Sequence, residues 1–200
     1  MGKRAVVVVI GLAALSAGCG GSGGGKTAAT APPRSASADR RAALPRGWRR
    51  VVNPGSGFNL GIPPGWTAHG VRGATLVRSR DRGLAVSIAA DYGQQGQALA
   101  PARYAAATLR ALRALRGYRR LRLGSARPVR GTRFAAAAVT ATGVYAPTGV
   151  RQAIRAIALQ RPGVVTFSLL VFRNVRVAER VYRRALDEMA RTFRAQPAQP

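Results

Sequence analysis

The chain has 200 residues, of which 47% are hydrophobic and 20% charged, so it can build one packed domain and is not disordered throughout. Its 33 Lys and Arg residues outnumber its 6 Asp and Glu residues, for a formal net charge of +27. The single cysteine excludes an intrachain disulfide and a metal site built on cysteines.

The excess of arginine has two explanations. It suits an anionic partner, such as nucleic acid, acidic lipid or a cell-wall polymer. Codon usage in a GC-rich genome would produce the same composition without any ligand. The arginines are scattered over all the expected elements and do not form one stripe, which favours codon usage over a selected ligand.

The first nineteen residues are typical of a bacterial lipoprotein signal. Lys3 and Arg4 precede an apolar stretch at 5–15, which is too short for a membrane span of about 20 residues. The run Leu-Ser-Ala-Gly-Cys at 15–19 resembles the lipobox, with Ser16 where a large aliphatic residue is preferred. We predict that residues 1–18 are a signal peptide and that Cys19 is the lipid-attachment site. An ordinary signal peptide with an incidental cysteine and an uncleaved anchor helix are the alternatives.

Three further parts follow along the chain. Residues 19–46 comprise the lipidated cysteine and a segment rich in Gly, Ser, Ala and Pro without apolar periodicity, which predicts a flexible tether. A flexible chain of that length reaches about 30 Å on average. Residues 47–196 form the predicted domain, and residues 197–200 a disordered tail.

The first half of the domain predicts four strands. Residues 48–52 form a short strand, and residues 58–62 alternate so that Phe58, Leu60 and Ile62 share one face. Pro63-Pro64-Gly65 stops this strand and Trp66 follows. Residues 74–79 and 84–92 are expected to form a β-hairpin around a turn at 80–83.

The middle of the domain predicts a helix over 101–116 and three strands, at 119–129, 132–145 and 150–160. Residues 164–172 are apolar on both faces. A strand of this kind is typical of the centre of a sheet that is covered on both sides.

The last element is an amphipathic helix that Asn174 can cap. Its apolar positions are predicted to face the core: Tyr182, Ala185, Leu186, Met189 and Phe193. On its other face, Glu179 with Arg183 and Asp187 with Arg191 are spaced as exposed ion pairs.

The segment Gly-Phe-Asn-Leu-Gly-Ile-Pro-Pro-Gly-Trp at 57–66 is an aromatic strand running into a tight turn. With Tyr104-Ala105 in the middle helix and Thr192-Phe193-Arg194 at the end of the last, it resembles the PsbP-like superfamily, in particular its bacterial lipoprotein branch of LpqN type. The resemblance covers residues 48–195. It implies an α+β fold, an antiparallel β-sheet flanked by helices on both faces (an α/β/α sandwich), and a non-catalytic accessory or binding role.

The residues needed for catalysis or metal binding are scarce. Photosynthetic members of the superfamily assist metal retention, but no matching ligands occur here, so we expect no metal and no cofactor. His69 is the one histidine, which leaves no Ser-His-Asp triad and no histidine-based zinc site. Asp81 and Asp91 are the one conceivable glycosidase-like pair, and we do not expect an enzyme.

Tyr118-Arg119-Arg120-Leu121-Arg122 places an aromatic side chain beside clustered charge, as in nucleic-acid binding. The predicted export argues against that partner, and we expect no nucleic acid. The sequence therefore predicts an exported protein, lipid-anchored on the extracytoplasmic face of a bacterial cell membrane, whose domain binds another envelope protein or a cell-wall component. The alternative is an electrostatic adaptor that lies on anionic lipid or cell-wall polymer through its arginines.

Overall fold

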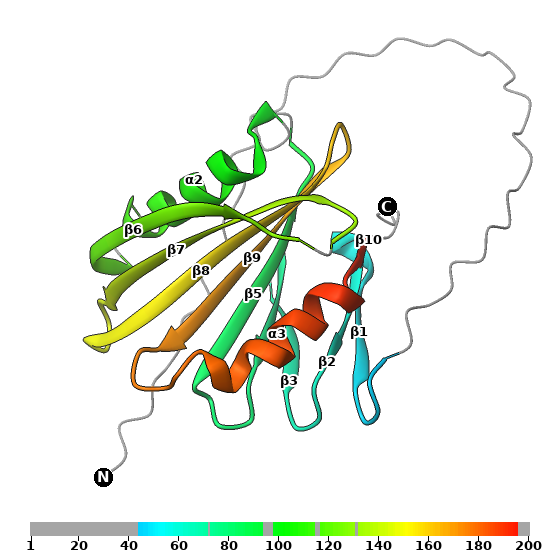
Figure 1. Ribbon diagram of the computed structural model, residues 1–200, viewed down its shortest axis with the longest axis horizontal. Helices are drawn as coiled ribbons and strands as arrows, with labels where there is room; N and C mark the ends of the chain where they lie inside the picture. Colours follow the sequence, from blue (N-terminus) through cyan, green and yellow to red (C-terminus); the bar gives the residue numbers. More distant parts are fainter. Residues whose placement is uncertain (1–43, 72, 94–97, 115–116, 131, 196–200) are drawn as a thin grey trace, which may run out of the picture.

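The computed structural model describes residues 44–71, 73–93, 98–114, 117–130 and 132–195. Cys19, the predicted signal peptide at 1–18, most of the predicted tether at 19–46 and the predicted tail at 197–200 lie outside these residues. Two sheets and two main helices make up the described domain (Figure 1). Their bounds are β1 Arg49–Asn53, β2 Phe58–Ile62, β3 Thr67–Val71, β4 Ala74–Arg78, β5 Leu84–Asp91, α2 Pro101–Ala114, β6 Tyr118–Pro128, β7 Ala135–Tyr145, β8 Val150–Arg161, β9 Val165–Asn174, α3 Arg180–Thr192 and β10 Arg194–Ala195.

The larger sheet has seven strands in the order β3-β4-β5-β9-β8-β7-β6, and every neighbouring pair is antiparallel. The apolar strand β9 lies at its centre, as predicted from its sequence. Val165, Phe167 and Leu169 pack on one face of β9, and Leu170 packs on the other. A strand with no solvated face must be apolar on both sides, which explains the unbroken run.

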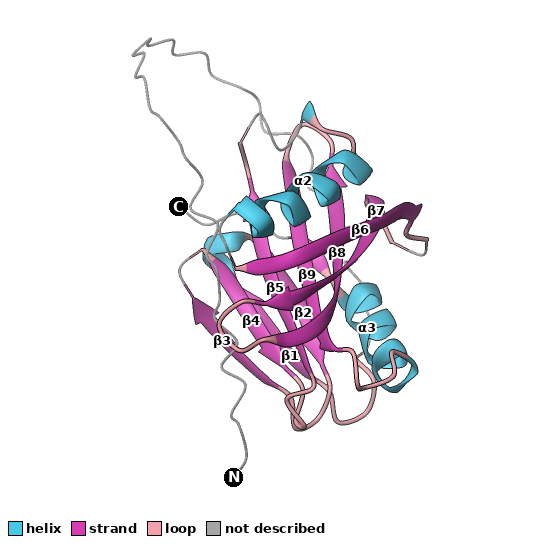
Figure 2. Cartoon of the chain, turned by 90° about the vertical axis from the view of Figure 1, so that its left-hand side faces the viewer, coloured by secondary structure: helices cyan, strands magenta, loops and turns pink. Residues whose placement is uncertain are grey.

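The two helices cover opposite faces of this sheet and different strands (Figure 2). Ala105, Leu109 and Leu112 of α2 pack over β6, β7 and β8. Tyr182 and Met189 of α3 pack on the other face, against side chains of β5 and β9. The predicted α+β fold, an antiparallel sheet with helices on both faces, is confirmed.

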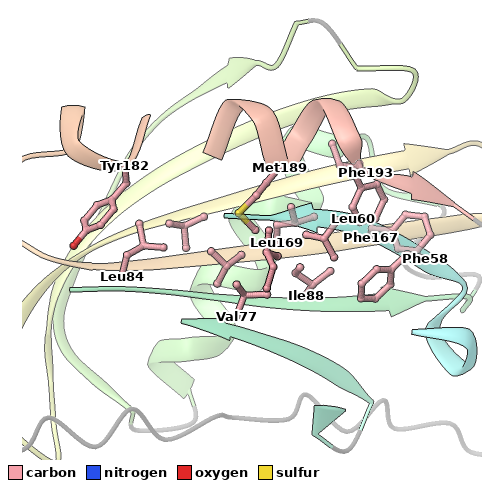
Figure 3. Close-up of a cluster of buried hydrophobic side chains, with 14 of the residues drawn as sticks. Phe58, Leu60, Val77, Leu84, Ile88, Phe167, Leu169, Tyr182, Met189 and Phe193 are labelled. Atoms are coloured by element: carbon pink, nitrogen blue, oxygen red, sulfur yellow. The ribbon is translucent and has the colours of Figure 1, made fainter. Parts of the chain in front are cut away.

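Three phenylalanine rings meet at one end of the core beneath α3 (Figure 3). Phe167 is fully buried and meets Phe193 edge to face, with ring centroids 5.0 Å apart. Phe58 stacks on Phe193 at 5.6 Å and meets Phe167 edge to face at 6.1 Å. These three rings come from β2, β9 and the end of α3, so they join the two sheets and the helix.

A smaller sheet, in the order β1-β2-β10, was not predicted as a separate layer. All five residues of β2 are buried, because α3 crosses it and β1 and β10 flank it. The N–H of Gly61 donates to Thr192 Oγ1 at 2.9 Å, and an added Cβ at Gly61 would lie 3.1 Å from that oxygen. Glycine therefore allows the end of α3 to lie close to β2.

Strand β3 was also missed. It is an edge strand in which His69 and Gly70 are exposed, so its sequence lacks the apolar alternation of a half-buried strand. Its register against β4, with His69 opposite Leu76, comes from the sheet and not from its own composition.

Two predictions about the last helix are wrong. The helix begins at Arg180, and the Asn174 side chain instead accepts a hydrogen bond from the N–H of Arg176 at 3.0 Å, within the turn before the helix. The ion pairs Glu179/Arg183 and Asp187/Arg191 do not form. Arg191 pairs with Glu188 at 2.8 Å, three residues earlier, because that spacing also brings side chains together on a helix.

The aromatic cluster predicts a large cost for Phe167→Ala. Removing this fully buried phenylalanine leaves a cavity beside the rings of Phe58 and Phe193, so we expect the free energy of unfolding to fall by about 3–5 kcal/mol. Urea denaturation of the variant and of Val181→Ala, a change at an exposed position of α3, measures this directly. A loss below about 1 kcal/mol for Phe167→Ala would contradict this packing role.

Candidate functional site

A groove opens where the coverage of the sheet by α3 ends. Figure 1 shows α3 crossing in front of β5, with β6, β7 and β8 extending beyond it. Helix α2 covers β6–β8 on the opposite face, and no helix of the described residues packs on the near face of these strands. The resulting cavity has a volume of about 400 Å³, within the usual range of small-molecule sites.

The floor of the groove is built from short side chains. Side chains alternate between the two faces of a strand, so Val139 and Ala141 of β7 face α2, whereas Thr140 and Thr142 face the groove. Ala153 of β8 lies opposite Thr142 and continues this row. Small floor residues leave the space that α3 does not fill.

Arginines stand among these short side chains. Arg155 of β8 is half-buried and lies between Thr140 on β7 and Val171 on β9. Arg122 of β6 lies opposite Thr142 and is exposed. Neither Arg122 nor Arg155 forms an ion pair with another residue in the described part of the chain. Their charges therefore remain available to a ligand.

Arg173 has a different role in the same groove. Its guanidinium donates a hydrogen bond to the carbonyl of Val177, which ties the end of β9 to the turn that leads into α3. Glu179 is the one acid among the described residues that line the groove. The lining is thus positive overall.

The α3 wall is apolar and is held by a hydrogen-bonded network. Leu84, Tyr182 and Leu186 line this side, and Figure 3 shows Tyr182 and Leu84 at the end of the core away from the phenylalanine rings. The Tyr182 hydroxyl donates to Asp81 Oδ2 at 2.6 Å. Asp81 Oδ1 accepts from Ser79 Oγ at 2.6 Å and from the N–H of Gly83 at 3.1 Å.

These hydrogen bonds shift two pKa values. The bond from Ser79, then that from Tyr182, lowers the pKa of Asp81 below its usual 3.8, because both favour the carboxylate. Burial, and secondarily the Asp81 carboxylate, raises the pKa of Tyr182 to about 12. At neutral pH a charged Asp81 therefore accepts from a protonated Tyr182.

The structure separates the acids and the histidine that the sequence analysis singled out. Asp81 and Asp91 lie at opposite ends of β5, roughly 25 Å apart at about 3.3 Å per residue, and Asp91 Oδ2 accepts from Tyr104 of α2 on the other face. They cannot act on one bond, so the glycosidase-like pair is wrong. His69 lies on edge strand β3. Within the described residues no group of three His, Cys, Asp or Glu side chains is placed to hold a metal ion.

The aromatic residue of the basic segment at 118–122 is not a stacking platform. Tyr118 is buried, and its hydroxyl donates to Gln152 Oε1 beneath α2. The neighbouring Arg119 and Arg120 are exposed. The arrangement proposed for nucleic-acid binding is therefore absent from this segment.

The groove was not predicted from the sequence. The one sequence pattern that could have indicated it is the spacing of Arg151 and Arg155. These residues are four apart on one strand and therefore lie on the same face of the sheet. The face of β6–β8 is uncovered because α2 and α3 lie over different strands. No local sequence pattern predicts this lateral offset between the two helices.

The comparisons with known proteins bear on the fold. No family model matches the chain, and no curated protein matches its sequence. The Ran-binding protein Mog1p of Saccharomyces cerevisiae is 11% identical, with a TM-score of 0.53 over 74% of this chain and 95% of Mog1p. The PsbP protein of the cyanobacterium Synechocystis, CyanoP, is 16% identical, with a TM-score of 0.53 over 74% of this chain and 92% of CyanoP.

The chain has the fold shared by PsbP and Mog1. This confirms the fold that the resemblance at 57–66 implied. LpqN of Mycobacterium tuberculosis, described as involved in cell envelope biogenesis, is 17% identical over 75% of this chain and 92% of LpqN, but its TM-score of 0.45 carries no conclusion. No helix in the described part of this PsbP/Mog1-fold domain is both long and apolar enough to cross a bilayer.

Tyr182→Phe tests the network behind the groove wall. Losing one hydrogen bond to a carboxylate should lower the free energy of unfolding by about 1–2 kcal/mol at pH 7. Because the folded pKa of Asp81 is depressed, the stability it contributes is present above its usual pKa and is lost as the pH falls through the folded value. Urea denaturation should therefore show the deficit of the variant narrowing in acid.

The matched control is Tyr92→Phe, which removes a hydrogen bond to the neutral carbonyl of Ser56. Its deficit should not change over the same pH range. A deficit of Tyr182→Phe that stays constant from pH 7 into the acid range would rule out Asp81 as the partner that matters.

Proposed function

We propose that this protein is an exported bacterial lipoprotein, attached through Cys19 to the extracytoplasmic face of the membrane, whose domain is a non-catalytic binding module of the cell envelope. The apolar stretch at 5–15 followed by Ser-Ala-Gly-Cys supports the anchor. The observation that carries the binding role is the groove between α3 and β6–β9, lined by Arg122 and Arg155 without acidic partners.

The arrangement of polar residues favours binding over catalysis. Asp81 is engaged by Ser79 and Tyr182, and it holds the wall of the groove in place. The other acid of the predicted pair lies at the far end of β5. In the groove, a ligand would meet arginines and threonines, which recognise and orient anions. We propose no metal and no cofactor for this role.

The tether defines where the module works. A tether of the length predicted at 19–46 would place the domain within about 30 Å of the bilayer. Leu44, at its end, is half-buried, and the carbonyl of Pro45 accepts from the N–H of Trp48 at 3.0 Å, so the last residues before the domain are already held against it. A partner in the envelope, either another exported protein or a cell-wall component, lies within that reach.

Replacing Cys19 tests the anchor. In cells that export the protein, labelled palmitate should be incorporated into the wild type and not into Cys19→Ser, and the variant should move from the membrane fraction to the supernatant, because two or more acyl chains hold a protein stably on a bilayer. Ser22→Ala, three residues into the tether, is the control and should fractionate as the wild type does. Palmitate labelling of Cys19→Ser, or none in the wild type, would refute the anchor.

Diffuse electrostatic binding is the second candidate function, favoured by exposed arginines on both helices, including Arg110 of α2 and Arg183 of α3. Such binding decays with the Debye length, about 10 Å at 0.1 M salt and about 3 Å at 1 M. We expect the Cys19→Ser chain to bind anionic vesicles weakly at low salt and to lose that binding near 1 M. Binding to the envelope partner that crosslinking in intact cells recovers should persist at about 1 M salt. If binding to the vesicles and binding to this partner are both lost at that salt, the electrostatic adaptor is favoured.

A further inference from the structure

The groove continues into a second depression on the same face of the sheet. This depression, with a volume of about 300 Å³, is lined by side chains of β6, β7 and β8, and by none of α3. Arg122 and Thr142 line both cavities, so the two adjoin each other. The other arginines of the depression are Arg120 and Arg151, and no acidic residue of the described ranges lines it.

The backbone of β6 is irregular where it supplies two of these arginines. The pairing with β7 shifts register between Arg119 and Arg122, which is a β-bulge, and Arg120 has a φ of 52°. Residues other than glycine rarely adopt this left-handed conformation, and bulges redirect side chains beside functional sites. Tyr118 and Leu121 both pack beneath α2, whereas regular alternation from Tyr118 would also put Arg122 on that face. The extra residue of the bulge therefore turns Arg122 to the groove side, where Arg120 also lies.

The other end of the groove has the opposite chemistry. Leu84 and Leu186, with the Tyr182 side chain, form an apolar wall at α3, and Val171 lies on the floor beside it. Leu84 and Val171 are buried members of the core, and Leu186 packs against it. A ligand lying along the groove would thus meet apolar side chains at α3 and arginines at β6.

We propose that the groove binds a single-chain amphiphile with a phosphate head group, its alkyl chain along the α3 wall and its phosphate at Arg120, Arg122 and Arg151. This deepens the proposed function by naming a ligand class for the same groove, and it rests on the groove being the binding site. Arginine donors match phosphate oxygens, and three guanidiniums around one depression offer more donors than a carboxylate can accept from. Arg155, half-buried between the two ends, lies where the head group joins the chain.

The charge and the concave shape together favour this ligand over a macromolecule. An acidic protein segment would satisfy the arginines but would leave the apolar wall of Leu84 and Leu186 without a matching partner. A neutral glycolipid would match the wall but would leave the arginines uncompensated. A phosphate on one alkyl chain satisfies both ends within enclosed spaces of small-molecule size.

The test uses the full-length Cys19→Ser chain, so that no acyl chain of its own competes for the groove. Dodecyl phosphate, kept below its micelle concentration, is titrated by calorimetry and by tryptophan fluorescence, since Trp66 lies edge to face with Tyr182 at 6.3 Å. We expect saturable binding at one site. Dodecyl maltoside and inorganic phosphate, which each carry one half of the chemistry, should bind at least ten-fold more weakly.

Variants locate the site. Arg122→Gln and Arg155→Gln should each weaken dodecyl phosphate binding at least ten-fold, whereas Arg110→Gln, an exposed arginine on α2, should leave it unchanged. Arg122 is exposed, so its replacement tests the site even if Arg155→Gln fails to fold. Leu186→Ser should weaken dodecyl phosphate at least ten-fold and leave the weak binding of inorganic phosphate as it was.

Three results would overturn the proposal. If dodecyl maltoside binds as tightly as dodecyl phosphate, the groove does not recognise a phosphate. If Arg110→Gln and Arg122→Gln lose equal affinity for dodecyl phosphate, the binding is diffuse and not confined to the groove. If polyglutamate displaces dodecyl phosphate and binds more tightly, the ligand is an acidic protein. If dodecyl phosphate does not bind while palmitate labelling and envelope crosslinking are observed, the proposed ligand class is refuted and the proposed lipoprotein function is retained. Failure of labelling would instead sink the anchor.

Discussion

The packing of α3 against β2, β5 and β9 is the interaction on which the rest of the structure depends. Phe58, Phe167 and Phe193 join the small sheet, the large sheet and the end of the helix in one aromatic cluster. Because these rings anchor the C-terminal end of α3 over β2, its first turns project toward β6–β8 without covering them. The groove is the space that remains, and its existence follows from where the rings hold the helix.

The second constraint is the sharing of polar residues between structure and binding. Asp81, Tyr182 and Ser79 satisfy one another and fix the first turn of α3 to the β4–β5 hairpin, while Arg173 fixes the turn before it. Near α3, Asp81 is therefore hydrogen-bonded to Ser79 and Tyr182. At the other end of the groove, the arginines form no ion pair with an acid of the described residues. Because of this imbalance, the two ends of the groove differ: the end at α3 is apolar and held by hydrogen bonds, and the end at β6–β8 is cationic and exposed. This local difference matters more for binding than the total charge of +27.

The elements that sequence analysis predicted correctly are those with a strong local pattern. β9 was recognised because a central strand buried on both faces has to be apolar throughout, and α3 because Tyr182 and Met189 recur at helical spacing. β3 was missed because an edge strand held by its neighbour needs no pattern of its own. Asn174 has the residue type of a helix cap, but the chain makes a further turn before α3, which the cap rule does not take into account.

The sequence by itself determined the order and type of most elements, the predicted lipid anchor at Cys19 and the scarcity of catalytic side chains, because each is a matter of local composition and spacing. Only the tertiary structure decided which arginines meet. Arg120, Arg122, Arg151 and Arg155 come from two strands separated in the sheet by β7, and their placement in two adjoining cavities requires both the bulge in β6 and the offset between α2 and α3. Strand register and helix placement are set by the burial of the whole core. Local sequence patterns therefore could not predict that these arginines lie close together.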